Sequence, residues 1–462
     1  MRRSVLSVVG SGETGPWSLR AGALLARAKQ WIVDDSDHSV TQRTAGTAFL
    51  IRVFSAALVY FSQILLARWM GRYEFGVYVY VWTWVVLVGG LAPLGLAYSA
   101  QRFIPEYSER GDLECLRGFL AGSRWLSFGL GTAAAGIGIA LILALGDRVP
   151  EHYRVPFLLA FACLPIFALS SAQDGVARSY NWFDIALVPG YVAQPLIILA
   201  IFAIAHAAGM PTTAMTGMIA TTAAIWSMVL VQRFLLERRL AASVEPGPRR
   251  YEVGYWFRTA LPLFLVDGFF FLLTYTDILV LQLFVGPADI AVYYAATKTL
   301  ALVAFIYYAV SVAFAHRFSR YHVAGERKKL EDFVADAVRW TFWPSLAAAL
   351  VLLALGKPIL MLFGAGFEQG YPLLFVLVLG LLARASVGPA ERLLNMVGEQ
   401  RICAVVYATA FTTNLVLCFV LVPRMGPVGA AISIATALIV ESVLLFVMTK
   451  RRLGIHAFFW RR

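Results

Sequence analysis

Residues 64–80 read ILLARWMGRYEFGVYVY, and this stretch decides how the chain folds. An apolar run ends at Gly71, a short polar turn covers residues 72–74, and a second apolar run begins at Phe75. Aromatic side chains flank the turn, as they do where membrane helices reach the water interface. The pattern predicts a tight hairpin between two membrane helices.

The remainder of the 462-residue chain is equally apolar, since 60% of its residues are hydrophobic and only 14% are charged. A soluble protein of this size keeps a far more polar exterior. Apolar runs of about 20 residues recur at short intervals, and each is long enough to cross a bilayer as a helix. The alternating ten-residue segments of a membrane β-barrel are missing from the sequence. We therefore predict an all-α polytopic membrane protein.

We expect about twelve transmembrane helices, since that many apolar runs have the length required. They cover residues 45–67, 76–98, 122–146, 155–175, 184–207, 213–236, 257–284, 289–314, 338–362, 371–394, 401–422 and 427–449. The connections alternate between short hairpins and longer stretches rich in Lys and Arg. Because basic residues gather in cytoplasmic loops, both termini are expected in the cytoplasm. The net charge of +12 follows from this topology and does not indicate a nucleic-acid partner.

The sequence contains an internal repeat. A shift of 215 residues places Arg43-Thr44-Ala45 on Arg258-Thr259-Ala260 and Gly71 on Gly286. Roughly a quarter of the positions from 43 to 103 match in this single register. The repeat predicts two six-helix lobes around a central cavity, an architecture typical of transporters.

The repeat and the charge pattern also define domains. We expect a cytosolic N-terminal tail, an N-terminal lobe, a cytoplasmic linker, a C-terminal lobe and a basic cytosolic tail, at residues 1–41, 42–236, 237–256, 257–449 and 450–462. Within the first tail, residues 20–33 form either a short amphipathic helix on the membrane surface or a loose linker.

Charged residues inside the spans are candidates for function, because a charge at the bilayer centre costs about 2.5–3.5 kcal/mol. Arg52 lies about 12 Å into the first span, and the repeat places Asp267 at the same depth in the seventh. Both would face the cavity; the alternative for Arg52 is a side chain that reaches back to the interface. Asp277 and Lys298 lie at similar depths. Either they form a static ion pair, or Asp277 is a carboxylate whose occupancy by a proton or Na⁺ changes during transport.

Two further arginines lie in predicted spans. Arg384 is about 15 Å from either face, where it would bind substrate or pair with Glu391 or Glu441. Arg124 lies near the cytoplasmic start of the third span, and its alternative is again to reach the interface. The sequence shows no metal-ligand spacing and no HExxH, GxSxG or Walker A pattern, so no enzyme is expected.

Several motifs at helix ends carry a family resemblance. After the first hairpin and one span comes RFIPEY at residues 102–107, and the C-terminal half contains NMVGEQR at 395–401 and LVPRMGPVGAA at 421–431. In these motifs the chain resembles the Wzx-type polysaccharide flippases of the multidrug/oligosaccharidyl-lipid/polysaccharide exporter superfamily. The resemblance covers about residues 42–455.

This resemblance implies alternating-access export of a polyprenyl-diphosphate-linked oligosaccharide across the bacterial inner membrane, for exopolysaccharide, O-antigen or capsule synthesis. Arg52, Lys298 and Arg384 would suit the diphosphate, with Arg124 as a fourth candidate, because Arg matches phosphate geometry. Asp267 and Asp277 would couple transport to a H⁺ or Na⁺ gradient. No cofactor is implied, and the expected partners are membrane lipids, glycosyltransferases and a polysaccharide polymerase.

Other functions remain open at this point. The main alternative is a cation-coupled multidrug exporter of the same superfamily, in which the acidic residues would recognise cationic drugs. A peptidoglycan-precursor flippase usually resembles a fourteen-span protein, which the count of twelve disfavours. A membrane glycan polymerase or ligase would need a sizeable outer loop, and the outer loops here are short.

Overall fold

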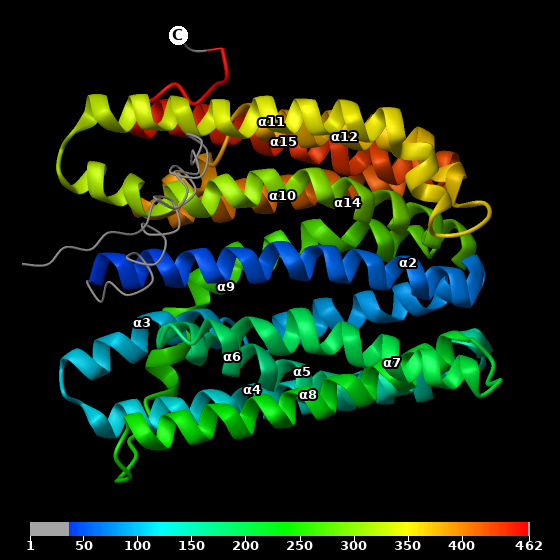
Figure 1. Ribbon diagram of the computed structural model, residues 1–462, viewed down its shortest axis with the longest axis horizontal. Coiled ribbons are helices and arrows are strands. Elements are labelled where there is room, and N and C mark those ends of the chain that lie inside the picture. The colour runs from blue at the N-terminus through cyan, green and yellow to red at the C-terminus, as the bar shows by residue number, and fades with distance from the viewer. Residues whose placement is uncertain (1–36, 461–462) are drawn as a thin grey trace, which may run out of the picture. The chain divides into compact units, whose positions relative to one another are not determined.

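The computed structural model describes residues 37–460, which form helices joined by turns, with no β-strand among them (Figure 1). The chain divides into a first unit, residues 1–51, and a second unit, residues 52–462. Of the first unit only residues 37–51, the start of helix α2, are described, so the proposed helix at 20–33 lies outside the described residues.

The helices of the two halves follow one another along the chain. The first half contains α2 (Asp37–Leu91), α3 (Leu96–Glu109), α4 (Leu113–Leu145), η1 (Gly146–Arg148), α5 (Glu151–Ser179), α6 (Phe183–Val188), η2 (Pro189–Ala193), α7 (Gln194–Ala207) and α8 (Ala214–Ser243). The second half contains α9 (Val253–Leu281), α10 (Pro287–Val323), α11 (Arg327–Met361), η3 (Phe367–Gly370), α12 (Tyr371–Ser386), α13 (Ala390–Met396), α14 (Gln400–Met425) and α15 (Pro427–Leu453).

The opening hairpin is made by a single residue. Helix α2 is interrupted only at Gly71, whose φ of 74° and ψ of 170° reverse the chain between two helical arms. Positive φ is costly for residues with a Cβ, which explains glycine at this turn. In Figure 1 the second arm of α2 runs back beside the first. The hairpin predicted around residue 71 is therefore present.

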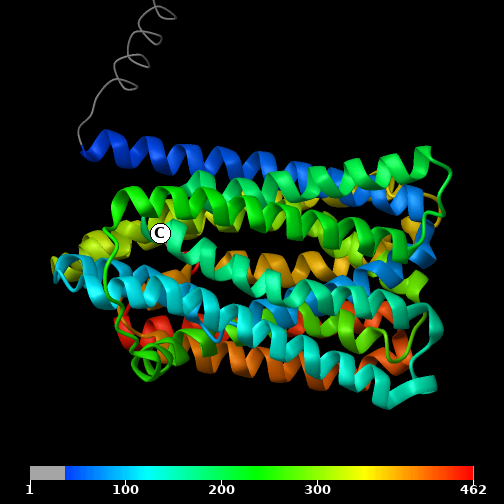
Figure 2. The ribbon, with the colours of Figure 1, turned by 90° about the horizontal axis from the view of Figure 1, so that it is seen from below.

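The apolar runs become helices of membrane-spanning length. Eleven helical stretches of the described residues are long and apolar enough to cross a bilayer. The first of them, Ile51–Glu109, contains the fold at Gly71 and therefore accounts for two predicted spans. The long helices lie side by side in both views, and their turns gather at two opposite ends (Figure 2). We name these the hairpin end, which contains Gly71 and Gly286, and the basic end, which contains residues 110–112 and 324–326.

The basic connections are shorter than the sequence pattern suggested, because helices continue into them. Residues 101–121 are largely helical in α3 and α4, and residues 315–339 are largely helical in α10 and α11. Amphipathic helices reach beyond the apolar core, and hydropathy alone does not mark their ends. The expected tenth span, 371–394, is broken, since α12 ends at Ser386 and Gly388 adopts a φ of 56° before α13 begins.

Residues 454–460 follow the last helix and pack on the C-terminal half. Ile455 and Ala457 are buried. The Phe459 N–H donates to the carbonyl of Ser386 at 3.2 Å, and its ring stacks on Phe342 with 4.0 Å between the centroids. The contact occupies one of the carbonyls left open at the C-terminal end of α12.

The linker between the halves, residues 244–252, is fastened to the N-terminal half. Arg250 pairs with Asp112 at 2.6 Å, and its N–H donates to the carbonyl of Glu114 at 3.0 Å. Asp112 also caps α4 by accepting the Cys115 N–H at 3.1 Å. This backbone hydrogen bond, aided by the charge of Arg250, lowers the pKa of Asp112.

Candidate functional site

The two halves meet along both arms of α2 and along α9 and α10. On the first arm, the hydroxyls of Tyr60 and Thr299 lie 3.0 Å apart. On the second arm, Gly76 approaches so closely that an added Cβ would overlap the carbonyl of Pro287. We call this surface the lobe interface. Polar side chains on it are the first candidates for a transport site.

Arg52 lies at the lobe interface. Its guanidinium carbon is 4.0 Å from the ring centroid of Tyr191 and 5.4 Å from that of Tyr308. Tyr191 comes from η2 in the N-terminal half and Tyr308 from α10 in the C-terminal half. A cation over an aromatic face is stabilised by the ring quadrupole, and more so where water is scarce. Arg52 thus joins rings from both lobes.

A break in the fifth span presents Tyr191. Pro189 and Gly190 begin a π-helical turn, η2, between α6 and α7. Pro removes a backbone donor, and π-turns inside helices occur often at functional sites. The Pro-Gly pair is therefore the local cause of the break.

Two charged residues beside Arg52 were missed by the sequence reasoning. Asp174 and Arg178 form an ion pair of 2.7 Å on α5, with side chains 26% and 28% exposed. Asp174 also interacts electrostatically with Arg52, and Arg178 with Tyr191 and Tyr308. The available signal was an acid and a base four residues apart near the end of an apolar helix, a spacing that places both on one face.

Asp267 does not lie against Arg52, although the repeat gave them equal depth. Its electrostatic neighbours are Glu391 and Arg392 of α13 and Tyr98 of α3. No described residue gives it a hydrogen bond or an ion pair. The repeat matched the depth of the two residues, but depth does not determine which neighbours a side chain contacts.

Asp277 and Lys298 are close in depth without forming a contact pair. The Tyr293 hydroxyl donates to the Asp277 carboxylate, and the Ile278 N–H donates to its Oδ1 at 2.8 Å. The Lys298 Nζ lies 4.7 Å from the ring centroid of Tyr294, and no described acid pairs with it. Neighbouring tyrosines of α10 therefore satisfy the two charges separately.

Arg384 pairs with Glu441, one of the two acidic partners that the sequence left open. The Arg384 Nε lies 3.2 Å from the Glu441 Oε1, and Glu441 is completely buried. The guanidinium also lies 4.8 Å from the ring centroid of Tyr307. Both Glu441 oxygens lack a hydrogen bond to the described residues, so the attraction is mainly between the two charges. Arg384 is held inside the C-terminal half.

Arg124 is remote from the lobe interface. Its Nε donates to the carbonyl of Leu120 at 2.7 Å, and its Nη1 lies 3.3 Å from Glu237 Oε1. These contacts place it between α4 and α8, at the basic end of the N-terminal half. The six predicted site residues therefore occupy several places.

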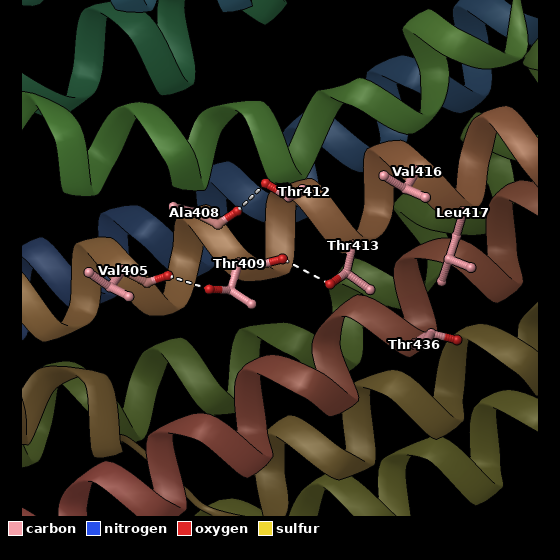
Figure 3. A pocket seen from close by; sticks show the side chains of 8 residues that line it. All are labelled: Val405, Ala408, Thr409, Thr412, Thr413, Val416, Leu417 and Thr436. Carbon is pink, nitrogen blue, oxygen red and sulfur yellow. Dashed lines mark hydrogen bonds between the residues drawn. The ribbon is translucent and has the colours of Figure 1, made fainter.

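A shallow groove on the C-terminal half contains none of these charges (Figure 3). It lies along α14 with Thr436 of α15 at its edge. The hydroxyls of Thr409, Thr412 and Thr413 each donate to the carbonyl four residues earlier. Such bonds satisfy a hydroxyl within its own helix, so the groove offers little polar recognition.

Metal-binding side chains do not cluster in the part of the chain that the structure describes. No group of three or more His, Cys, Asp or Glu side chains within residues 37–460 could hold a metal ion. Cys115, Cys163, Cys403 and Cys418 are buried and free.

The fold is similar to that of several solved transporters. The fold matches a solved lipid II flippase MurJ in an inward closed conformation with a TM-score of 0.69 and 16% identity, covering 87% of each chain. It matches an inward-facing multidrug resistance MATE family transporter with a TM-score of 0.69 and 16% identity, covering 87% of this chain and 93% of that one. A MOP superfamily transporter from Pyrococcus furiosus matches with a TM-score of 0.60 and 14% identity, covering 88% and 93%.

The structure is therefore a multi-pass membrane protein with the two-lobed fold of these transporters. Residues 262–420 match the MatE family model. No curated protein sequence matches the chain. The family match covers about a third of the chain, and the similarity of fold extends over both lobes.

Proposed function

We propose that the chain is a flippase that moves a polyprenyl-diphosphate-linked oligosaccharide across the bacterial inner membrane for cell-surface polysaccharide synthesis. The observation that carries this proposal is Arg52, whose guanidinium lies between Tyr191 of one lobe and Tyr308 of the other. A guanidinium binds phosphate through paired hydrogen bonds, which suits a diphosphate. As the lobes separate, phosphate oxygens would replace one ring as its neighbour.

The cations at the lobe interface offer the headgroup a path. Lys298 lies about 10 Å nearer the hairpin end than Arg52 at 1.5 Å per residue, counted from Gly286 and Gly71. It forms no ion pair with a described acid, although Asp277 lies within electrostatic range, so in this proposal its ammonium group can contact phosphate. Asp174 and Arg178 supply acceptors and donors for sugar hydroxyls beside Arg52. The lipid chains would remain in the bilayer beside the lobes.

The remaining candidates take other roles in this proposal. Arg384, paired with buried Glu441, stabilises the C-terminal lobe and does not contact cargo. Asp267 and Asp277 couple transport to a H⁺ or Na⁺ gradient. A cation bound at Asp277 would compete with the Tyr293 hydroxyl for the carboxylate. Because Asp277 is on α9 and Tyr293 on α10, cation binding would then influence the position of α10 relative to α9. No other cofactor is proposed.

The proposed setting follows the charge distribution. Basic residues are frequent in the stretches 101–121, 232–258 and 315–339, which support the proposal that the basic end faces the cytoplasm. Glycosyltransferases would supply the cargo at that face, and a polysaccharide polymerase would receive it at the opposite face.

A cation-coupled multidrug exporter is the second candidate. One observation favours it: Asp267 has no ionic partner among the described side chains and lies beside Tyr98, an arrangement that would attract an organic cation. The cations at the lobe interface would repel such a substrate, which makes this the weaker candidate.

The proposal is tested by replacing Arg52 and Lys298 with Ala and measuring surface polysaccharide at matched protein levels. We expect each variant to lose most export, and Arg52→Lys to recover only part of it, because Lys lacks the paired donors. Arg68→Ala, an exposed arginine on the same helix as Arg52, is the control. Unchanged export in both Ala variants would overturn the proposal, and altered drug resistance without altered polysaccharide would favour the exporter.

Ion coupling needs a separate measurement. Transport by the reconstituted protein should depend on an imposed pH or Na⁺ gradient, and Asp277→Asn should remove that dependence. Transport that ignores both gradients would eliminate the coupling role of Asp267 and Asp277 while leaving the flippase assignment intact.

A further inference from the structure

A charged groove lies at the basic end of the N-terminal half, away from the lobe interface. Helices α4 and α8 both pack on α5, which holds them apart, and the linker 244–252 crosses the gap between them. The resulting groove has a volume of about 550 Å³. Arg117 and Arg124 of α4 and Arg249 of the linker line it.

These arginines are positioned by different contacts. The Arg117 Nε donates to the carbonyl of Glu245 at 2.8 Å, which fastens the linker over the groove. Arg124 meets Glu237, which also accepts from Arg233 at 3.1 Å. Arg249 makes no hydrogen bond or ion pair with any described residue, so its charge is uncompensated.

Part of the groove wall is apolar. Leu120 of α4 and Leu240 of α8 both line it. Beside it on the same helices, Trp125 is 66% exposed and Phe234 is 64% exposed. Exposed aromatic side chains next to arginines are typical of the headgroup level of a membrane. The groove therefore combines cations at that level with an apolar surface.

We propose that this groove binds the headgroup of an anionic phospholipid. The phosphate would contact Arg249 and Arg124, and an acyl chain would follow the apolar surface between α4 and α8. Basic pockets between membrane helices are suited to acidic headgroups for this reason. Glu237 and Glu245 also line the groove, so binding depends on the three arginines and is sensitive to salt. The site is separate from the cargo path proposed above.

A bound headgroup would connect three elements. It would touch α4, α8 and the linker together and so add to the contacts of Arg117 and Arg250 that already fasten the linker. Anionic lipid would then stabilise the N-terminal half with its linker, whichever cargo the transporter carries.

The test measures binding of phosphatidylglycerol to the purified full-length protein in neutral detergent by native mass spectrometry. We expect phosphatidylglycerol to bind more tightly than phosphatidylcholine. The Arg249→Gln variant should bind it about fivefold more weakly, since each basic residue near a membrane surface contributes about 1 kcal/mol. Arg249→Lys should retain binding, and Arg124→Gln combined with Arg249→Gln should weaken it further.

The matched control replaces two exposed arginines elsewhere, Arg148 and Arg401, with Gln. It removes the same charge and should leave phosphatidylglycerol affinity unchanged. Equal loss in the control, or equal affinity for the two lipids in the wild type, would overturn the proposal. If the double variant does not fold, Arg249→Gln decides alone, because no described contact depends on that side chain. Retained lipid binding in an Arg52→Ala variant without export would show that the site is independent of cargo.

Discussion

The two lobes treat buried charge differently. In the N-terminal lobe Asp174 and Arg178 are hydrogen-bonded at 2.7 Å, and about a quarter of each side chain is exposed. In the C-terminal lobe Arg384 meets Glu441 at 3.2 Å, and Glu441 has no exposed surface. The first pair keeps access to the lobe interface and to Arg52, and the second is sealed among helices.

The difference shows that depth in the membrane does not define a site. A sealed pair whose carboxylate has no further hydrogen bond holds helices together, and removing the acid leaves a buried charge without its counter-ion. A pair that remains partly exposed can exchange its partner for a ligand at lower cost. Four measurements would break or sharpen this comparison.

The largest effect is expected for Glu441→Leu. The substitution leaves Arg384 buried without its counter-charge, which should cost about 3–5 kcal/mol of stability. Thermal unfolding of the detergent-solubilised protein measures the loss. Arg384→Met combined with Glu441→Leu should recover most of it, because neither charge then remains. A single variant as stable as the wild type would contradict the assignment of this pair as structural.

A smaller loss is expected at the contact between the lobes. In Gly76→Ala the added Cβ would overlap the carbonyl of Pro287, and a crowded contact of this kind costs about 1–3 kcal/mol. Gly129→Ala on α4 is the matched control, since a Cβ added there would meet no atom within 4 Å. Equal melting temperatures for both variants would show that the lobes do not meet at Gly76.

The linker is fastened to the N-terminal lobe through the pair of Arg250 and Asp112. Replacing Asp112 tests how much this attachment contributes to stability. Asp112→Ala removes the cap of α4 and the partner of Arg250, for a loss of about 1 kcal/mol. The folded state lowers the Asp112 pKa, so its contribution is present above about pH 4 and fades as the pH falls through the folded pKa. The difference in melting temperature between wild type and variant should therefore become smaller as the pH is lowered below about 4. A gap that persists in acid would exclude the ionised cap as the cause.

The smallest loss of stability is expected for Arg178→Gln. A partly exposed pair at this spacing contributes about 0.2–1 kcal/mol, so the melting temperature should barely change. Export should nevertheless fall, because the acceptor and donor beside Arg52 are altered. A large loss of stability with normal export would reverse the contrast drawn between the lobes.

Much of the fold was predictable because hydropathy reports helix number directly. The hairpin at Gly71 and the two-lobed fold follow from local composition and the repeat. The extensions of α10 and α11 were not predictable, since polar helical residues look like loops in a hydropathy profile. The break after Ser386 was missed for the opposite reason, because its neighbours remain apolar.

The candidate residues were chosen by their depth in the membrane, which can be counted along the sequence. The direction in which each side chain leaves its helix cannot be counted in this way. Depth identified Arg52 and Arg384, and the structure supplied their partners. It also grouped Arg52 with Asp267, which has other neighbours. Asp174 and Arg178 escaped notice because they lie near a predicted helix end, where charge is unremarkable; only the position of α5 beside η2 makes them neighbours of Arg52.

The single-residue turn at Gly71 has a practical consequence for mapping topology. Proteases cut exposed, flexible loop tips, and a reversal made by one glycine between two helical arms offers no such substrate. Gly426, which joins α14 directly to α15, has the same property. Digestion of intact vesicles would therefore leave these hairpins uncut from either side. Sidedness is better determined with a membrane-impermeant thiol reagent on a cysteine introduced at Tyr73, which is 46% exposed and leaves the glycine of the turn in place.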